Sequence, residues 1–381
     1  MRFLFVTAAF TGHYNPLVPL GWAARAGGHD VIVASHPSFA KTITCAGLPA
    51  LPVGRDIEPF TFLSRGRGRP NRSANGNDRG PAGFRRAAEG LAELMAPDAA
   101  DFARSWRPQV VVYEPMALAG PLLGRIVGVP AVRHLWTMDF TGPSNDFARD
   151  MEGPLVTSYG FDRLPVNGDL TIDPCPPRLQ IADKIPRQLI RYIPYNGPAV
   201  FPAWLREPPV RPRVCVTWGT TLGHLGRMAH VPQVVRALAD LDVEVVVAVL
   251  DAHRGLFTDL PANVAFVGPI ALDLLLPTCA AVVHQGGGGT TMTALVHGVP
   301  QLVVSSLPDQ AFNARRLAAV GAGRYAPSGD RANTEEILAE ARIILSDPGY
   351  RQIATELRGE LLAQPTPAEV IPVLEELAAH H

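Results

Sequence analysis

A stretch from Cys279 to Gly323 constrains the fold more than any other part of the chain, because apolar segments and glycine-rich turns alternate in it. Ala280–Val283 has the length and β-branched content of a buried strand. The strand ends at His284, and four consecutive glycines, 286 to 289, lead into a helix-like segment. Gly298 and Pro300 predict the end of that helix, and a second apolar strand, residues 301–305, follows it. This order predicts two parallel strands joined by a helix.

The same stretch has the chemistry of an anion-binding site. Glycines allow backbone N–H groups to approach a bulky anion without interference from a Cβ atom. The N-terminus of the following helix adds a partial positive charge that favours phosphate. Asp309 and Gln310 follow the second strand, at the sheet edge where ligands of parallel sheets bind. We therefore expect a site for a phosphate attached to a molecule rich in hydroxyls.

The composition of the chain excludes several classes of protein. A length of 381 residues allows two domains, and a net charge of −1 with 18% charged residues gives no electrostatic reason to bind nucleic acid or a membrane. The pattern of Met1–Val6 indicates a strand and does not match a signal peptide. The apolar run 243–250 is too short to span a bilayer. We therefore expect a cytoplasmic protein. The cysteines show neither metal-ligand spacing nor a disulfide framework, being scattered at Cys45, Cys175, Cys215 and Cys279.

Strand-like and helix-like segments alternate in both halves of the chain, which predicts two doubly wound α/β domains with parallel sheets. We expect an N-terminal domain over residues 1–200, a linker over 201–212 at the end of a proline-rich segment, a second domain over 213–360 and a final helix over 361–381. The expected strands are 3–7, 30–34, 109–113 and 131–135 in the first half, and 214–218, 244–249, 264–267, 280–283 and 301–305 in the second.

One segment, residues 65–86, is rich in Arg, Gly, Asn and Pro. Such a basic run is compatible with nucleic-acid binding, but it lacks interleaved aromatic residues, and a solvated loop is the simpler interpretation. Aromatic and other apolar side chains of the first half suggest an apolar ligand for that domain: Phe60, Phe62, Phe84, Trp136, Met138 and Phe140.

The combination of His284, the glycine run, Asp309-Gln310, Asn313 and Gly321 resembles the donor-sugar signature of family 1 glycosyltransferases with the GT-B fold. The pattern is most similar to actinobacterial members that attach deoxysugars to polyketide and other antibiotic aglycones. The resemblance implies two Rossmann-like domains whose sheets face each other across a cleft, with the last helix returning to the N-terminal domain.

This resemblance also assigns roles on the donor side. It implies that the diphosphate contacts His284, Gly287, Gly289 and Thr290 and that Asp309 and Gln310 hold sugar hydroxyls, although these two could also form an exposed loop. Gly219 and Thr220, in the turn after the strand 214–218, are either a second phosphate contact or a simple turn.

The resemblance assigns the catalytic base to His13, in the segment Thr11–Pro16, which is similar to the G-H-x-x-P segment of the family. An imidazole with a near-neutral pKa suits that role, but a histidine that caps the helix or is merely exposed would look the same in the sequence. Glu114, at the end of a neighbouring strand, stands where the family usually has aspartate. The longer side chain leaves two alternatives, a hydrogen bond to His13 or a cap on the following helix.

Two departures from the family pattern concern the nucleoside. The base-stacking tryptophan of the family aligns near Pro269, so we expect the base to lie against the backbone of Ile270. Relatives that use uridine diphosphate sugars have a glutamate for the ribose hydroxyls at the position of Met292. A thioether cannot accept a hydrogen bond from a 2′-hydroxyl but packs well against a deoxyribose, which favours a thymidine diphosphate sugar. The alternative is that Met292 faces the core and the ribose lies elsewhere.

The resulting hypothesis is an inverting transfer from a TDP-deoxysugar to a hydroxyl of an apolar aglycone. It needs no cofactor and no metal, and no nucleic-acid or membrane partner is expected; a homodimer is left open. Three alternatives remain: an NAD-dependent oxidoreductase, whose fingerprint the glycine spacing matches poorly, a catalytically silent partner of a glycosyltransferase, and a sugar-nucleotide epimerase of the same fold.

Overall fold

The computed structural model describes residues 1–56, 81–141, 147 and 149–381. Phe60, Phe62 and most of the arginine-rich segment 65–86 lie outside the described residues. The chain forms two compact units. The first comprises Met1–Pro174, Ile181–Arg191 and Gln364–His381, and the second comprises Cys175–Gln180 and Tyr192–Ala363.

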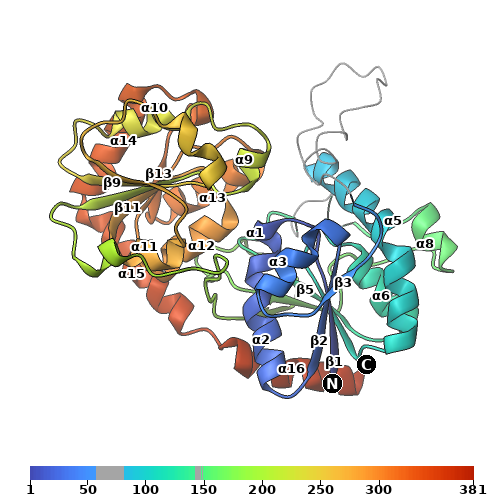
Figure 1. The fold of residues 1–381 in the computed structure, drawn as a ribbon. Helices are drawn as coiled ribbons and strands as arrows, with labels where there is room; N and C mark the ends of the chain where they lie inside the picture. Colours follow the sequence, from blue (N-terminus) through green and yellow to red (C-terminus); the bar gives the residue numbers. More distant parts are fainter. Residues whose placement is uncertain (57–80, 142–146, 148) are drawn as a thin grey trace. The chain divides into compact units, whose positions relative to one another are not determined.

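The first unit is built on a seven-stranded sheet in the order β3-β2-β1-β4-β5-β6-β7, in which all neighbouring strands are parallel (Figure 1). Its strands are β1 (Arg2–Val6), β2 (Asp30–Ser35), β3 (Ala50–Pro52), β4 (Val110–Tyr113), β5 (Ala131–His134), β6 (Leu170–Asp173) and β7 (Arg187–Leu189). Its helices are α1 (Thr11–Tyr14), α2 (Val18–Ala26), α3 (Ala40–Cys45), α5 (Pro81–Trp106), α6 (Ala119–Val127), α8 (Pro154–Ser158) and α16 (Pro367–His380).

The second unit is built on a six-stranded, entirely parallel sheet in the order β10-β9-β8-β11-β12-β13 (Figure 1). Its strands are β8 (Arg213–Thr217), β9 (Glu244–Ala248), β10 (Val264–Gly268), β11 (Cys279–His284), β12 (Gln301–Val303) and β13 (Gly323–Tyr325). Its helices are α9 (Thr221–His224), α10 (Val231–Ala237), α11 (Leu272–Leu275), α12 (Gly288–Val296), α13 (Pro308–Ala319), α14 (Thr334–Ser346) and α15 (Pro348–Leu362).

The predicted class, two doubly wound domains with parallel sheets, is confirmed. Central strands such as β1 and β8 are buried along almost their whole length because helices cover both faces of each sheet, so they read as continuous apolar runs. The strands that the sequence did not predict are β3, β6, β7 and β13, each of only three or four residues. Three of them, β6, β7 and β13, contain polar or charged residues (LTID, RQL and GRY) and therefore lack the apolar run that is typical of a buried strand.

The last helix belongs to the first unit, as the resemblance implied. Helix α16 packs against α2, and the Nε2 atom of His29 lies 3.3 Å from Oε1 of Glu375. The helix begins at a capping box, in which Thr366 and Glu369 each bind the backbone N–H of the other. Residues 201–212 were expected to form a linker but belong to the second unit, where Leu205 packs in a core cluster. The main segment of this unit begins at Tyr192.

Candidate active site

In the first unit, two loops meet where the strand order changes direction. Strands β1 and β4 are parallel neighbours with Val6 opposite Tyr113, so the loops that follow them leave the same edge side by side. His13 lies in α1, in the loop after β1, and Glu114 immediately follows β4. This topology brings together two residues that are 101 positions apart in the sequence.

Glu114 binds His13 and also holds the surrounding loops. Its Oε2 atom lies 3.1 Å from Nδ1 of His13, its Oε1 accepts a hydrogen bond from the backbone N–H of Ala8, and its Oε2 accepts another from that of Met116. The carboxylate is completely buried. The additional methylene of glutamate therefore does not prevent the hydrogen bond to His13. The alternative, a cap on the following helix, does not occur, because α6 begins at Ala119 and its N-cap residue is Leu118.

The hydrogen bond determines which nitrogen of His13 is available. A carboxylate only accepts hydrogen bonds, so Nδ1 of His13 donates, and in the neutral ring Nε2 retains a lone pair. The His13 side chain remains 19% exposed. The pair thus has the arrangement of an oriented base, in which a buried carboxylate sets the tautomer of the imidazole.

Aromatic side chains surround this pair. Phe10 lies 5.1 Å from the His13 ring, between ring centroids, and Trp136 stacks on it. Phe84 and Phe140, predicted to contact an apolar ligand, lie edge to face at 5.3 Å. Met138 was expected to take part but is only 1% exposed, so it packs in the interior instead.

In the second unit, the glycine run forms the predicted turn at the start of a helix. Gly286 has a φ of 93°, a conformation that L side chains rarely adopt, and Gly287 is the N-cap of α12. Gly287 has no side chain with which to cap α12, and the first backbone N–H groups of a helix have no partner within it. The backbone at Gly287, Gly289 and Thr290 thus has the arrangement expected of an anion cradle.

The structure corrects the assignment of His284. The ring is completely buried, its Nε2 lies 3.0 Å from Oε1 of Gln301, and its Nδ1 accepts a hydrogen bond from the backbone N–H of Gly286. Burial lowers the pKa of His284 to about 4, so the imidazole is neutral at neutral pH. Both nitrogens have partners inside the protein. His284 therefore holds the glycine turn in place and offers no donor to a diphosphate.

Gln285, the next residue along the chain, lies between the two turns. Its side chain is 4% exposed, and its Oε1 is buried with no hydrogen-bond partner among the described residues. A Cβ atom on Gly219 would lie 2.6 Å from its Nε2, and one on Gly287 would lie 2.7 Å from the same atom. The carboxamide therefore fills the space between the turn after β8, which contains Gly219 and Thr220, and the start of α12. In the sequence, the one signal for Gln285 was that a polar residue stands directly next to the glycine run.

Helix α13 is attached to the same turn. Asn313 donates from Nδ2 to the backbone oxygen of Gly286 at 2.8 Å, which connects α13 to the glycine turn. Oε1 of Gln310 accepts hydrogen bonds from the backbone N–H groups of Ser306 and Leu307, so this atom caps the helix and is not available to a sugar. Asp309 lies in the first turn and is partly exposed, and its role toward a sugar stays a prediction.

The structure also corrects the assignment of Met292. Its side chain is completely buried, the neighbouring residues from Thr290 to Leu295 are buried as well, and Met292 presents no surface to a ribose. Ile270 follows the end of β10, is partly buried and packs against a core cluster. The contact of its backbone with a nucleobase stays a prediction.

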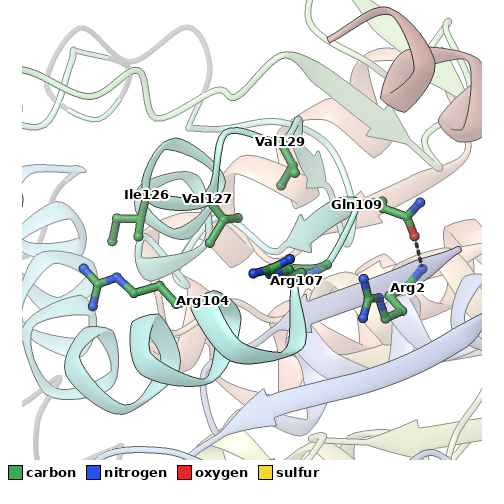
Figure 2. A pocket seen from close by; sticks show the side chains of 8 residues that line it. Arg2, Arg104, Arg107, Gln109, Ile126, Val127 and Val129 are labelled. Carbon is green, nitrogen blue, oxygen red and sulfur yellow. Dashed lines mark hydrogen bonds between the residues drawn. The ribbon is translucent and has the colours of Figure 1, made fainter.

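Away from these loops, the first unit has a hollow of about 440 Å³ at the opposite edge of its sheet, where the strands begin (Figure 2). Three arginines line it, Arg2, Arg104 and Arg107, beside an apolar wall (Figure 2). Arg104 lies in the last turn of α5, and Arg107 adopts the left-handed conformation that ends this helix, with a φ of 53°. Cations are favoured at a helix C-terminus, so the charges of Arg104 and Arg107 have a structural explanation.

Within the described residues, no group of three His, Cys, Asp or Glu side chains could hold a metal ion. In the same part of the chain, no helix is long and apolar enough to cross a membrane.

Two α/β units, one with an oriented histidine and the other with a glycine cradle, define a glycosyltransferase of the GT-B fold. The chain belongs to the family described as Erythromycin biosynthesis protein CIII-like, whose N-terminal domain matches residues 22–219 and whose C-terminal domain matches residues 232–377.

Similar proteins of known activity transfer sugars. The chain is 36% identical to 10-deoxymethynolide desosaminyltransferase of Streptomyces venezuelae, over 100% of this chain and 98% of that protein. It is 40% identical to L-demethylnoviosyl transferase of Streptomyces niveus, over 97% and 96% of the two chains. Its structure matches that of spinosyn rhamnosyltransferase SpnG complexed with thymidine diphosphate with a TM-score of 0.87, at 34% identity and over 98% and 100% of the two chains. The chain is therefore an enzyme that transfers sugars.

The buried imidazole of His284 predicts a specific pH dependence of stability. Its folded pKa of about 4 lies below the ordinary value of 6.5, so the unfolded chain binds more protons between these values and the free energy of unfolding rises with pH there. Replacing His284 by glutamine should lower this slope by about 1.4 kcal/mol per pH unit. Urea unfolding at several pH values between 4 and 6.5 measures the slope.

The comparison must be made between variant and wild type, because burial also lowers the pKa of His134 to about 4, and this residue contributes to both slopes. Equal slopes in the two proteins would contradict the burial of a neutral His284.

Proposed function

We propose that the enzyme transfers a deoxysugar from a thymidine diphosphate sugar to a hydroxyl of an apolar natural-product aglycone, with His13 as the base and inversion at the anomeric carbon. The observation that carries this proposal is the hydrogen bond between His13 and the buried carboxylate of Glu114. Relatives support the substrate classes: one is named TDP-daunosamine transferase, and spinosyn rhamnosyltransferase SpnG has been solved with thymidine diphosphate and with the spinosyn aglycone.

In the proposed step, the acceptor oxygen forms a bond to the anomeric carbon while the bond from that carbon to the diphosphate oxygen breaks. The electron pair of the broken bond leaves with the diphosphate. Nε2 of His13 takes the acceptor proton, and Glu114 stabilises the resulting imidazolium. A single displacement, without a carboxylate nucleophile, inverts the anomeric centre.

On the donor side, we propose that the diphosphate binds at the start of α12, with the backbone of Gly287, Gly289 and Thr290 and the carboxamide of Gln285 as its contacts. The helix N-terminus supplies partial positive charge, and Gln285 supplies an N–H donor next to both turns. Asp309 remains the candidate for the sugar hydroxyls. The preference for thymidine no longer rests on Met292, which is buried, and rests instead on the relatives.

The helix N-terminus and Gln285 would do the work that Mg²⁺ does in other sugar transferases, so we propose a metal-independent reaction. Activity should survive exhaustive EDTA treatment, measured as initial rate before and after treatment. An activity that returns only on adding Mg²⁺ or Mn²⁺ would refute this.

The alternatives from the sequence are less well supported. A silent partner protein would not need the His13–Glu114 hydrogen bond, and the named relatives are transferases rather than epimerases or oxidoreductases.

Replacing His13 by alanine should lower kcat by roughly 10²- to 10⁴-fold, because the acceptor hydroxyl loses its base. The Kd of thymidine diphosphate should remain unchanged, since its proposed contacts belong to the second unit. Steady-state kinetics with a neutral alcohol acceptor and calorimetric titration measure the two quantities. Near-wild-type turnover in this variant would exclude His13 as the base.

Replacing Gln285 by alanine should weaken thymidine diphosphate binding by roughly 10-fold or more, because a hydrogen bond to a charged group contributes about 1.5–3 kcal/mol. Gln352, exposed on α15 of the same unit, provides the matched control, and its replacement by alanine should leave Kd unchanged. An unchanged Kd in the Gln285 variant would remove the carboxamide from the diphosphate site.

A further inference from the structure

The loop after β5 places an aromatic ring on the face of the proposed base. Trp136 lies in this loop, and its indole stacks on the imidazole of His13 with ring centroids 3.9 Å apart and an angle of 9° between the planes. The indole is itself 92% buried, since only 8% of Trp136 is exposed. Strand β5 is the parallel neighbour of β4, so the loops that carry His13, Glu114 and Trp136 follow three adjacent strands, β1, β4 and β5.

The stack restricts a motion that Glu114 leaves free. The hydrogen bond from Nδ1 of His13 to Glu114 holds one atom of the ring, and by itself it does not fix the tilt of the ring plane. A parallel ring in van der Waals contact opposes that rotation. The direction in which Nε2 points is therefore determined by Glu114 and Trp136 together.

A buried ion-pair network makes the Trp136 loop rigid. Asp139 accepts at Oδ2 from Arg133 at 2.6 Å and from Arg187 at 3.1 Å, and at Oδ1 from the backbone N–H and the hydroxyl of Thr141. The side chains of Arg133 and Asp139 are 1% and 0% exposed. Arg133 lies on β5 and Arg187 on β7, so the loop is attached to two strands of the sheet. A buried charge that lost its partners would be strongly destabilising, which opposes opening of the loop.

We propose that Trp136 is a positioning residue for the base: its indole sets the plane of the His13 imidazole and, after proton transfer, faces the imidazolium with its electron-rich surface. This inference rests on the proposed role of His13. Stacking of an aromatic face on a cation contributes most strongly for tryptophan and more where water is excluded. The contact would therefore favour the transition state, in which His13 gains charge, over the ground state.

A double-mutant cycle between Trp136 and His13 tests the proposal. With a neutral alcohol acceptor, Trp136→Leu should lower kcat by roughly 5- to 30-fold and leave the donor KM unchanged. Trp136→Phe, which retains an aromatic face, should lose less. In the His13→Ala background, Trp136→Leu should change the residual kcat by less than about 2-fold, because residues that act through one another are not additive.

Two controls make the outcome decisive. Trp22→Leu, at a half-exposed tryptophan on α2, should leave kcat unchanged. An acceptor acidic enough to ionise unaided should reduce the effect of Trp136→Leu, because such an acceptor needs no base. Trp136→Phe is the conservative variant if the leucine variant does not fold.

Each outcome supports or overturns the inference. An equal loss of kcat from Trp136→Leu with and without His13 would show that the indole contributes independently of the base. Full activity in both Trp136 variants would show that the indole contributes nothing. Either result overturns the inference while leaving His13 as the base. Near-wild-type kcat in His13→Ala alone would instead refute the proposed function, and the two failures are therefore distinguishable.

Discussion

In each unit, the candidate site depends on one constraint: two neighbouring parallel strands whose connections leave in opposite directions. In the first unit, β1 continues to β2 on one side and pairs with β4 on the other, and in the second unit β8 is related to β9 and β11 in the same way. At such a point the loops after the two central strands diverge and leave room at the carboxyl edge of the sheet. His13 and Glu114 use this arrangement in one unit, and Gly219 and Gln285 use it in the other.

Buried polar side chains then convert the available space into defined geometry. An interior polar group is costly unless it is hydrogen-bonded, so a buried carboxylate or imidazole orders the loops that supply its partners. Glu114 orders the loops after β1 and β4, His284 and Gln301 connect the glycine turn to α12, and Asn313 connects that turn to α13. In both units, buried polar side chains therefore order the loops, and these side chains do not themselves need to contact a substrate.

The corrections at His284 and Met292 rest on the same observation, the burial of both side chains. Both side chains belong to the structure that supports the cradle, and both are completely buried beneath it. A family motif identifies a turn but does not say which of its side chains face a ligand, because adjacent residues at a strand end point in opposite directions. His284 completes β11 and points inward, and Gln285, one residue further, reaches the space between the two turns. The sequence therefore located the turn correctly, but not the side chain that lies between the two turns.

The sequence alone determined the class of fold, the position of both sheets' central strands and the two short segments that form the site. These features depend on local composition: buried parallel strands are continuous apolar runs, and a tight turn before a helix needs glycine. Only the tertiary structure decided that the longer side chain of Glu114 still reaches His13, that Trp136 covers the ring, and that Gln285 rather than His284 lies between the turns. These are contacts between residues far apart in the chain, or choices between the two faces of one strand. They depend on how strands pair and side chains pack, which no local pattern in the sequence records.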